Sequence, residues 1–305
     1  MLRYSILFSI LVFAIFGYSC KEQSRDSKPW LAFYLGGQSN MDGYGLISEL
    51  PDSLNQVFDD VYIFHGNPVG DDEKNGGLGI WTQLRPGHGA GFAANAKSNR
   101  YANRFGPELS FAARIKQLYP NHKIALIKYS RGGSSLDSLA KVHGQWHPEY
   151  SRINQYDHFL TTVSNAFAVK DIDGDGKYDK LNMSAIIWMQ GESDADKIEI
   201  AALEYGENLN SMMQLQRAAF HNKTLAIVIG KISDAHKSEG RQVWTYLDLV
   251  QNAQESFVAN DKNSIIVRST ANYNYSDMWH YDSKGFIDLG IQFANHYYIL
   301  NQKNQ

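Results

Sequence analysis

A serine near the start of the chain and an Asp-x-x-His sequence near its end have the residue types of a nucleophile, a base and the acid that orients the base. Ser39 lies in LGGQSNMDGYG, directly after an apolar stretch. A serine hydroxyl is nearly inert at neutral pH and needs a base. His280 is the best candidate, because Asp277 precedes it by three residues and one turn would bring the carboxylate to the imidazole. Such a pair also occurs as a helix cap followed by a surface residue, so the pair alone leaves both interpretations open.

Acyl transfer also requires hydrogen-bond donors for the negative charge that develops on the carbonyl oxygen. Gly132 in YSRGGSSL offers a backbone N–H directly after an apolar run, and Gln190 in WMQGESDAD offers a side-chain amide. The backbone N–H of Ser39 is the third candidate. Each alone is compatible with an ordinary turn or a capping amide. Their joint occurrence after successive apolar runs favours an oxyanion hole.

Short apolar runs alternate with amphipathic helical patterns along most of the chain. The runs cover 30–35, 61–64, 123–129, 184–190, 224–230 and 264–268. The helical patterns cover 107–119, 156–169, 198–221, 241–258 and 283–300. This alternation predicts a three-layer α/β/α sandwich with a mainly parallel sheet. Because parallel strands end at one edge of the sheet, we expect the polar segments that follow them to converge.

The polar segments also resemble the conserved blocks of a known family. GGQSNMDG, RFGPELSFA, YSRGGSSL, WMQGESDAD and DMWH are similar to blocks of the sialate O-acetylesterase-like (SASA) domains and of acetyl xylan esterases of carbohydrate esterase family 6, within the SGNH (GDSL-type) hydrolases. The resemblance runs from about residue 31 to about residue 300. It implies a flavodoxin-like SGNH fold.

The same resemblance implies roles for individual residues. Ser39 corresponds to the nucleophile, His280 to the general base and Asp277 to its orienting acid, with Gly132 and Gln190 in the oxyanion hole. Gln38 and Glu192 match motif positions whose role is to hold the site together, and the amide of Asn40 is placed to tie down the same turn.

The implied activity is hydrolysis of O-acetyl esters on a glycan through an acyl-enzyme, for which no cofactor is needed. Two alternatives remain open at this point. One is a catalytically weak glycan-binding lipoprotein with the same fold, and the other is a short-chain esterase or lipase that acts on non-sugar esters. Xylan, sialic acid, pectin and algal glycans are all compatible carriers of the acetyl group.

Residues 171–182, DIDGDGKYDKLN, resemble the first part of a calcium-binding loop. Asp171, Asp173, Asp175 and Asp179 have the spacing of its oxygen ligands, with Gly176 at the sixth position. The twelfth position is an asparagine instead of the usual bidentate glutamate. The pattern therefore leaves two interpretations, a structural calcium site and a solvated acidic turn.

The beginning of the chain has the pattern of an export signal. Residues 1–20, MLRYSILFSILVFAIFGYSC, place one positive charge before an apolar run that is short for a membrane span. Cys20, the only cysteine, lies where a lipoprotein signal is cut and acylated; plain secretion and a retained anchor are the alternatives. We expect a polar tether over 21–29, one esterase domain over 30–305, and an exported protein held at the membrane only through Cys20, periplasmic or at the cell surface, or otherwise secreted.

The overall charge narrows the set of partners. The formal net charge is −3 and there is no long basic run, so nucleic acid is not expected as a partner. An O-acetylated carbohydrate is the partner that the motifs indicate.

Overall fold

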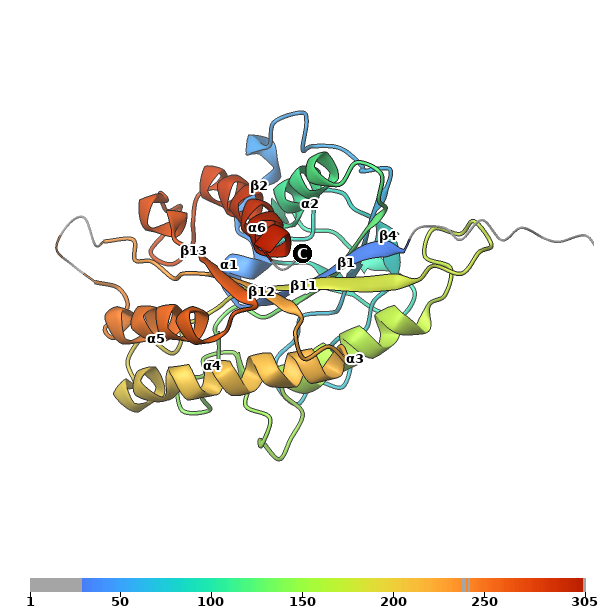
Figure 1. Cartoon of the computed structure of the whole chain (residues 1–305). Helices are drawn as coiled ribbons and strands as arrows, with labels where there is room; N and C mark the ends of the chain where they lie inside the picture. The colour runs from blue at the N-terminus through green and yellow to red at the C-terminus, as the bar shows by residue number, and fades with distance from the viewer. Residues whose placement is uncertain (1–28, 237–239, 241, 304–305) are drawn as a thin grey trace, which may run out of the picture.

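A seven-stranded sheet lies at the centre of the computed structural model, which describes residues 29–236, 240 and 242–303 (Figure 1). Its spatial order is β13-β12-β11-β1-β8-β3-β4. All neighbouring strands are parallel except β4, which runs antiparallel to β3. The strands are β1 (Trp30–Gly37), β3 (Val61–His65), β4 (Trp81–Gln83), β8 (Ile124–Ser130), β11 (Leu181–Met189), β12 (Ala226–Gly230) and β13 (Ser264–Val267).

Helices cover both faces of this sheet (Figure 1). On one face, α2 packs against α6, and α6 contacts β12 and β13. On the other face, α4 packs against α5, and α3 contacts β8 and β3. The helices are α2 (Glu108–Leu118), α3 (Gln155–Ala168), α4 (Glu199–Ala219), α5 (Leu247–Asn260) and α6 (Ser283–Lys303). None of these described helices has the length and apolar composition needed to cross a membrane.

The two-sided cover explains why the strands have continuous apolar sequences. A strand buried on both faces has no solvent side, so it does not alternate apolar and polar residues. Every residue of β8 is buried, including the charged Lys128. The predicted three-layer α/β architecture with a mainly parallel sheet is confirmed.

Three local features differ from the sequence-based expectation. The helix predicted from residue 241 begins at Leu247. The long segment 66–103 contains β4, a three-residue edge strand too short to show a period. The described residues also form short elements: the strand pairs β2 (Gly45–Leu46) with β7 (Arg104–Phe105), β5 (Ala93–Ala94) with β6 (Asn99–Arg100) and β9 (Ser134–Ser135) with β10 (Gly144–Gln145), and the 3-10 turns η1 (Ile47–Glu49) and η3 (Ser269–Asn272). The predicted signal segment 1–20 and residues 21–28 of the tether lie outside the described residues.

The central strand β1 lies where the order of the strands reverses. The chain after β1 builds β3 and β8 on one side, and later β11, β12 and β13 on the other side. In an open α/β sheet, ligands bind at the carboxyl ends of the strands at such a point. Gly37 makes the close packing of β1 and β11 possible, since a Cβ there would lie 1.9 Å from the main-chain oxygen of Met189.

Candidate active site

Ser39 is the first residue of α1 (Ser39–Asp42), a single turn that follows β1 directly. Its side chain is almost buried, with 7% of the residue exposed. It lines a cavity of about 1300 Å³ at the carboxyl edge of the sheet. The same cavity is lined by His280, Gly132, Tyr44 and Trp279. The predicted convergence of segments from both ends of the chain is therefore seen around this cavity.

His280 lies on the loop before α6 and is oriented by Asp277. Its ring Nδ1 is 2.8 Å from Oδ2 of Asp277. The other oxygen of Asp277 accepts hydrogen bonds from the N–H groups of Trp279 and His280, both at 2.8 Å. A neutral imidazole that donates from Nδ1 to the carboxylate has Nε2 free to accept a proton. The Asp277 side chain thus fixes both the loop and the tautomer of the ring.

Ser39 and His280 share the cavity, but among the described contacts no hydrogen bond joins the hydroxyl to the imidazole. In enzymes without bound substrate, such bonds are often long and tighten only in the substrate complex. The cavity therefore contains the hydroxyl of Ser39 and the imidazole of His280, whose Nε2 has no hydrogen-bond partner among the described residues.

The surroundings of His280 hold its imidazole in the neutral form. The ring of Tyr44 stacks on it with centroids 3.5 Å apart and planes 4° apart. Burial lowers the pKa of His280, and the neighbouring carboxylates of Asp277 and Asp42 only partly oppose this. Burial acts to raise the pKa of Asp277, but the hydrogen bonds from His280 and from the N–H of Trp279 bring it below its ordinary value. The pair is therefore a neutral base beside a carboxylate.

Gln38 connects the serine segment to the end of β11. Its Oε1 accepts hydrogen bonds from Nε2 of Gln190 at 3.3 Å, from the N–H of Gly191 at 3.2 Å and from the N–H of Ser193 at 3.3 Å. The residue is 3% exposed. One buried oxygen therefore holds three groups of the QGESD segment against the start of α1.

Asn40 connects the serine segment to the histidine loop. Its Nδ2 donates to Oε1 of Glu192 at 2.8 Å and to the main-chain oxygen of Trp279 at 3.1 Å. Its Oδ1 accepts from the N–H of Tyr281 at 3.3 Å. Glu192 is 1% exposed, and burial raises its pKa to about 6. The amide of Asn40 therefore ties the serine segment to the main chain on both sides of His280.

The two non-serine oxyanion candidates have different positions. Gly132 lies beside the nucleophile, since a Cβ built on it would be 3.4 Å from Cβ of Ser39. Its N–H donates to Oδ2 of Asp42 at 2.8 Å. Gln190 is fully buried and is not among the described residues that line the cavity. Its Nε2 donates to Oδ2 of Asp194 at 2.6 Å.

Four residues that line the cavity had no role in the prediction from sequence. These are Asp42, Tyr44, Arg131 and Trp279. Asp42 could have been noticed, because a residue three positions after the serine shares its face of a helical turn. Trp279 could have been noticed as an aromatic next to the base, and its side chain is 48% exposed at the cavity.

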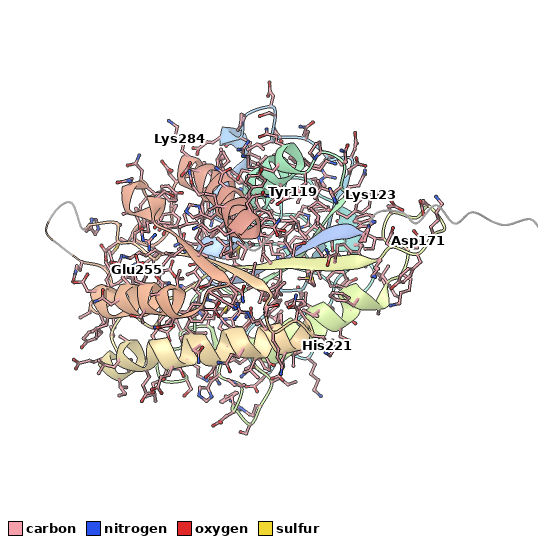
Figure 2. All side chains as sticks on the ribbon, in the orientation of Figure 1. Tyr119, Lys123, Asp171, His221, Glu255 and Lys284 are labelled. Atoms are coloured by element: carbon pink, nitrogen blue, oxygen red, sulfur yellow. The ribbon has the colours of Figure 1, made fainter. Side chains whose placement is uncertain are left out.

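The acidic loop lies at the opposite edge of the sheet. Figure 2 shows Asp171 and Lys123 together at the end where β1 and β11 begin. Carboxylate oxygens of Asp171, Asp173 and Asp179 lie within 4.8 Å of one another. Asp175 is outside this group and pairs with Lys177 at 2.9 Å. Any role of the loop is therefore remote from Ser39.

The fold and the cavity define the class of the protein. A three-layer sandwich with a serine at the end of its central strand, and a His–Asp pair before its last helix, is built like an SGNH-type esterase. A model of the family described as "Carbohydrate esterase, sialic acid-specific acetylesterase" matches residues 30–299, and the chain belongs to this family.

Several solved structures share the fold of this chain. A protein of Arabidopsis thaliana superposes with a TM-score of 0.63 at 19% identity, over 89% of this chain and 98% of its own. A carbohydrate acetylesterase from Xanthomonas citri gives 0.58 at 16% identity, over 89% of this chain and 57% of its own. NanS gives 0.57 at 15% identity, over 90% of this chain and 98% of its own. No curated protein matches the sequence. The family match indicates an esterase that acts on acetylated sugars, and the solved structures show that the fold is shared.

Proposed function

We propose that the protein hydrolyses O-acetyl esters on a glycan, with Ser39 as nucleophile, His280 as general base and Asp277 as the acid that orients it. One observation carries the proposal. The His280–Asp277 pair, joined at 2.8 Å, lines the same cavity as a serine at the end of the central strand. The family match supports the ester chemistry and the sugar substrate.

Acylation in this proposal moves one proton and one acetyl group. Ser39 Oγ attacks the acetyl carbonyl carbon while its proton passes to Nε2 of His280. The carbonyl electron pair moves to the oxygen, and the backbone N–H groups of Ser39 and Gly132 are the donors beside it. When this intermediate collapses, the C–O bond to the sugar breaks and the sugar oxygen takes the proton from His280. The acetyl group remains on Ser39.

Deacylation follows the same steps, with water in place of Ser39 as the nucleophile. Water attacks the acetyl-Ser39 carbonyl and gives a proton to Nε2 of His280. The bond to Ser39 Oγ breaks, acetate leaves, and the proton returns to the serine oxygen. His280 thus acts as base and as acid in each half of the reaction, and Asp277 stabilises the imidazolium each time.

Acetate release from a panel of acetylated glycans tests the proposal. The panel includes acetylated xylan, pectin and O-acetyl sialic acids, with the wild-type protein and Ser39→Ala compared on each. We expect release by the wild type and a loss of at least about 10³-fold in Ser39→Ala. A Ser39→Ala protein that turns over like the wild type would exclude the serine mechanism. Wild-type protein that binds glycans without releasing acetate would support the glycan-binding alternative.

Two further proposals concern parts of the chain away from the cavity. The acidic loop is proposed to hold a structural calcium ion through Asp171, Asp173 and Asp179, and the short distances between their carboxylates support this.

Export with acylation of Cys20 is proposed from residues 1–20 alone. Incorporation of labelled palmitate that disappears in Cys20→Ser would support the lipid anchor, and unlabelled wild-type protein would exclude it.

A further inference from the structure

The carboxylate of Asp42 accepts a hydrogen bond from the N–H of Gly132, one of the donors that the proposed reaction needs. Its Oδ2 accepts from the N–H of Gly132 at 2.8 Å, and its Oδ1 accepts from the hydroxyl of Ser130. An oxyanion hole works because its donors point at the position where negative charge develops. In the free protein one of the two backbone donors beside Ser39 therefore already points at a carboxylate.

The local geometry makes this contact a consequence of the helical turn α1. Ser39 and Asp42 are its first and last residues, three positions apart, so their side chains lie on one face of the turn. A Cβ on Gly132 would lie 3.3 Å from Oδ2 of Asp42 and 3.4 Å from Cβ of Ser39. The carboxylate and the serine thus border the same point of the Gly132 backbone, and both line the cavity.

Among the described residues, no cation forms a salt bridge with the carboxylate of Asp42. Lys128 approaches, but its Nζ donates to the main-chain oxygen of Asp42 at 2.9 Å and to Oε2 of Glu108 at 2.8 Å. Lys128 and Glu108 form a fully buried pair whose charges balance. The charge of Arg131 also favours the ionised form of Asp42. Burial raises the pKa of Asp42, although Ser130, Lys128 and Arg131 oppose this.

We propose that Asp42 is a positioning residue that limits the oxyanion hole: its carboxylate competes with the acyl oxygen of the substrate for the N–H of Gly132. The inference rests on the proposed function of Ser39. Two like charges in a site of low dielectric repel strongly, so an anion on this donor opposes the oxyanion that forms there. Removal of the charge then weakens the competition for this donor and removes the repulsion, so the rate of acyl transfer rises.

Two substitutions separate charge from shape. Asp42→Asn keeps an acceptor for the N–H of Gly132 but has no charge, and Asp42→Ala removes both. We expect kcat for acetate release to rise on the order of tenfold in Asp42→Asn, with KM changed less than twofold. We expect a similar rise in Asp42→Ala. Asp60→Asn is the matched control: it removes one negative charge beside the start of β8, at the other edge of the sheet, and leaves kcat unchanged.

Inhibition by methylboronic acid gives a second readout, because it forms a tetrahedral anionic adduct with a serine hydroxyl. We expect about tenfold tighter inhibition of Asp42→Asn than of the wild type. A kcat in Asp42→Asn at or below that of the wild type, with a loss in Asp42→Ala, would show that Asp42 is only a structural tie and would overturn the proposal. Failure of the proposed function has a different signature: a wild-type protein that releases no acetate. Adduct formation measured by mass spectrometry still reports on Asp42 in that case.

Discussion

The side chains of Asp277 and Tyr44 constrain the imidazole of His280 through three contacts. Asp277 holds Nδ1, the Tyr44 ring covers one face, and the N–H of His280 is bonded to the same carboxylate. The guanidinium of Arg104 lies over the Tyr44 ring, 4.5 Å from its centroid. A histidine held in this way loses little freedom when it accepts a proton, which is the condition for an efficient base.

The pH dependence of turnover follows from the environment of His280. The base acts only when it is neutral, so activity is lost as the pH falls through its pKa. Burial lowers that pKa, so wild-type activity should persist below about pH 6.5, where an ordinary histidine is half-protonated. Asp277→Asn removes a carboxylate that favours the imidazolium. We expect its acid limb to move to still lower pH and its kcat to fall by about 10²–10⁴-fold.

Profiles of log(kcat/KM) between pH 4 and pH 8 measure both effects. Asp282→Asn is the control, because this acid lies on the same loop and its carboxylate accepts from the N–H of Gly285 instead of contacting His280. Wild-type turnover in Asp277→Asn would mean that the carboxylate does not orient the base.

At the scale of the elements, the strands and helices were predictable because their signals are local. Apolar runs without alternation predicted the buried strands, and each of the six runs overlaps one of the observed parallel strands. The edge strand β4 was not predictable, since three residues are too few to show a period. The role of Asp42 was hidden for another reason: its carboxylate meets Gly132, 90 residues away. The sequence also could not show that Gln190 donates to Asp194 instead of facing the cavity.

Calcium binding to the loop between α3 and β11 should affect the melting temperature of the protein. If calcium binds to Asp171, Asp173 and Asp179, a chelator removes a ligand that favours the folded state and lowers the melting temperature. At calcium concentrations about 100 times the dissociation constant, this stabilisation is ~2.7 kcal/mol, which corresponds to several degrees for a domain of this size. Because the loop is remote from Ser39, kcat measured well below the melting temperature should not change.

Calorimetry with EGTA and with added calcium checks this effect. Asp171→Asn should lose the response, whereas Asp175→Asn should keep it, because Asp175 lies outside the group and pairs with Lys177. Lys123 contacts Asp173 and can balance part of the negative charge without a metal. Equal melting temperatures with calcium and with EGTA would leave the loop as a solvated acidic turn.

At the scale of the whole molecule, the site is held by buried acids that destabilise the fold when they ionise. Asp194 is fully buried, and its oxygens accept from the N–H groups of Leu136 and Asp137 and from Gln190. Burial nevertheless raises its pKa to about 7. Burial raises the pKa of Glu192 to about 6. Both acids connect the end of β11 to neighbouring segments, so the position of the site and the stability of the domain depend on the same side chains.

The sign of the effect on stability follows from proton binding. Between about pH 4 and about pH 7 the folded protein keeps a proton on Asp194 that the unfolded chain has lost, so the contribution of Asp194 to stability falls as the pH rises through this window. The buried histidines act in the opposite direction, since burial lowers the pKa values of His65 and His88. Their contribution falls as the pH drops below about 6.5. A pH scan of the wild type alone therefore mixes the two effects.

Asp194→Asn isolates the contribution of the acid. The asparagine cannot ionise, and it retains an acceptor for one of the two backbone N–H groups that the carboxylate binds. Its amide can donate to Oε1 of Gln190, a buried oxygen with no hydrogen-bond partner among the described residues. We expect Asp194→Asn to raise the melting temperature by about 5 °C at pH 8, and to raise it much less at pH 5. Asp196→Asn, at a partly exposed acid paired with Lys197, is the control and should shift neither value. A change of equal size at both pH values would mean that packing and hydrogen bonding, and not the buried charge, set the stability at this position.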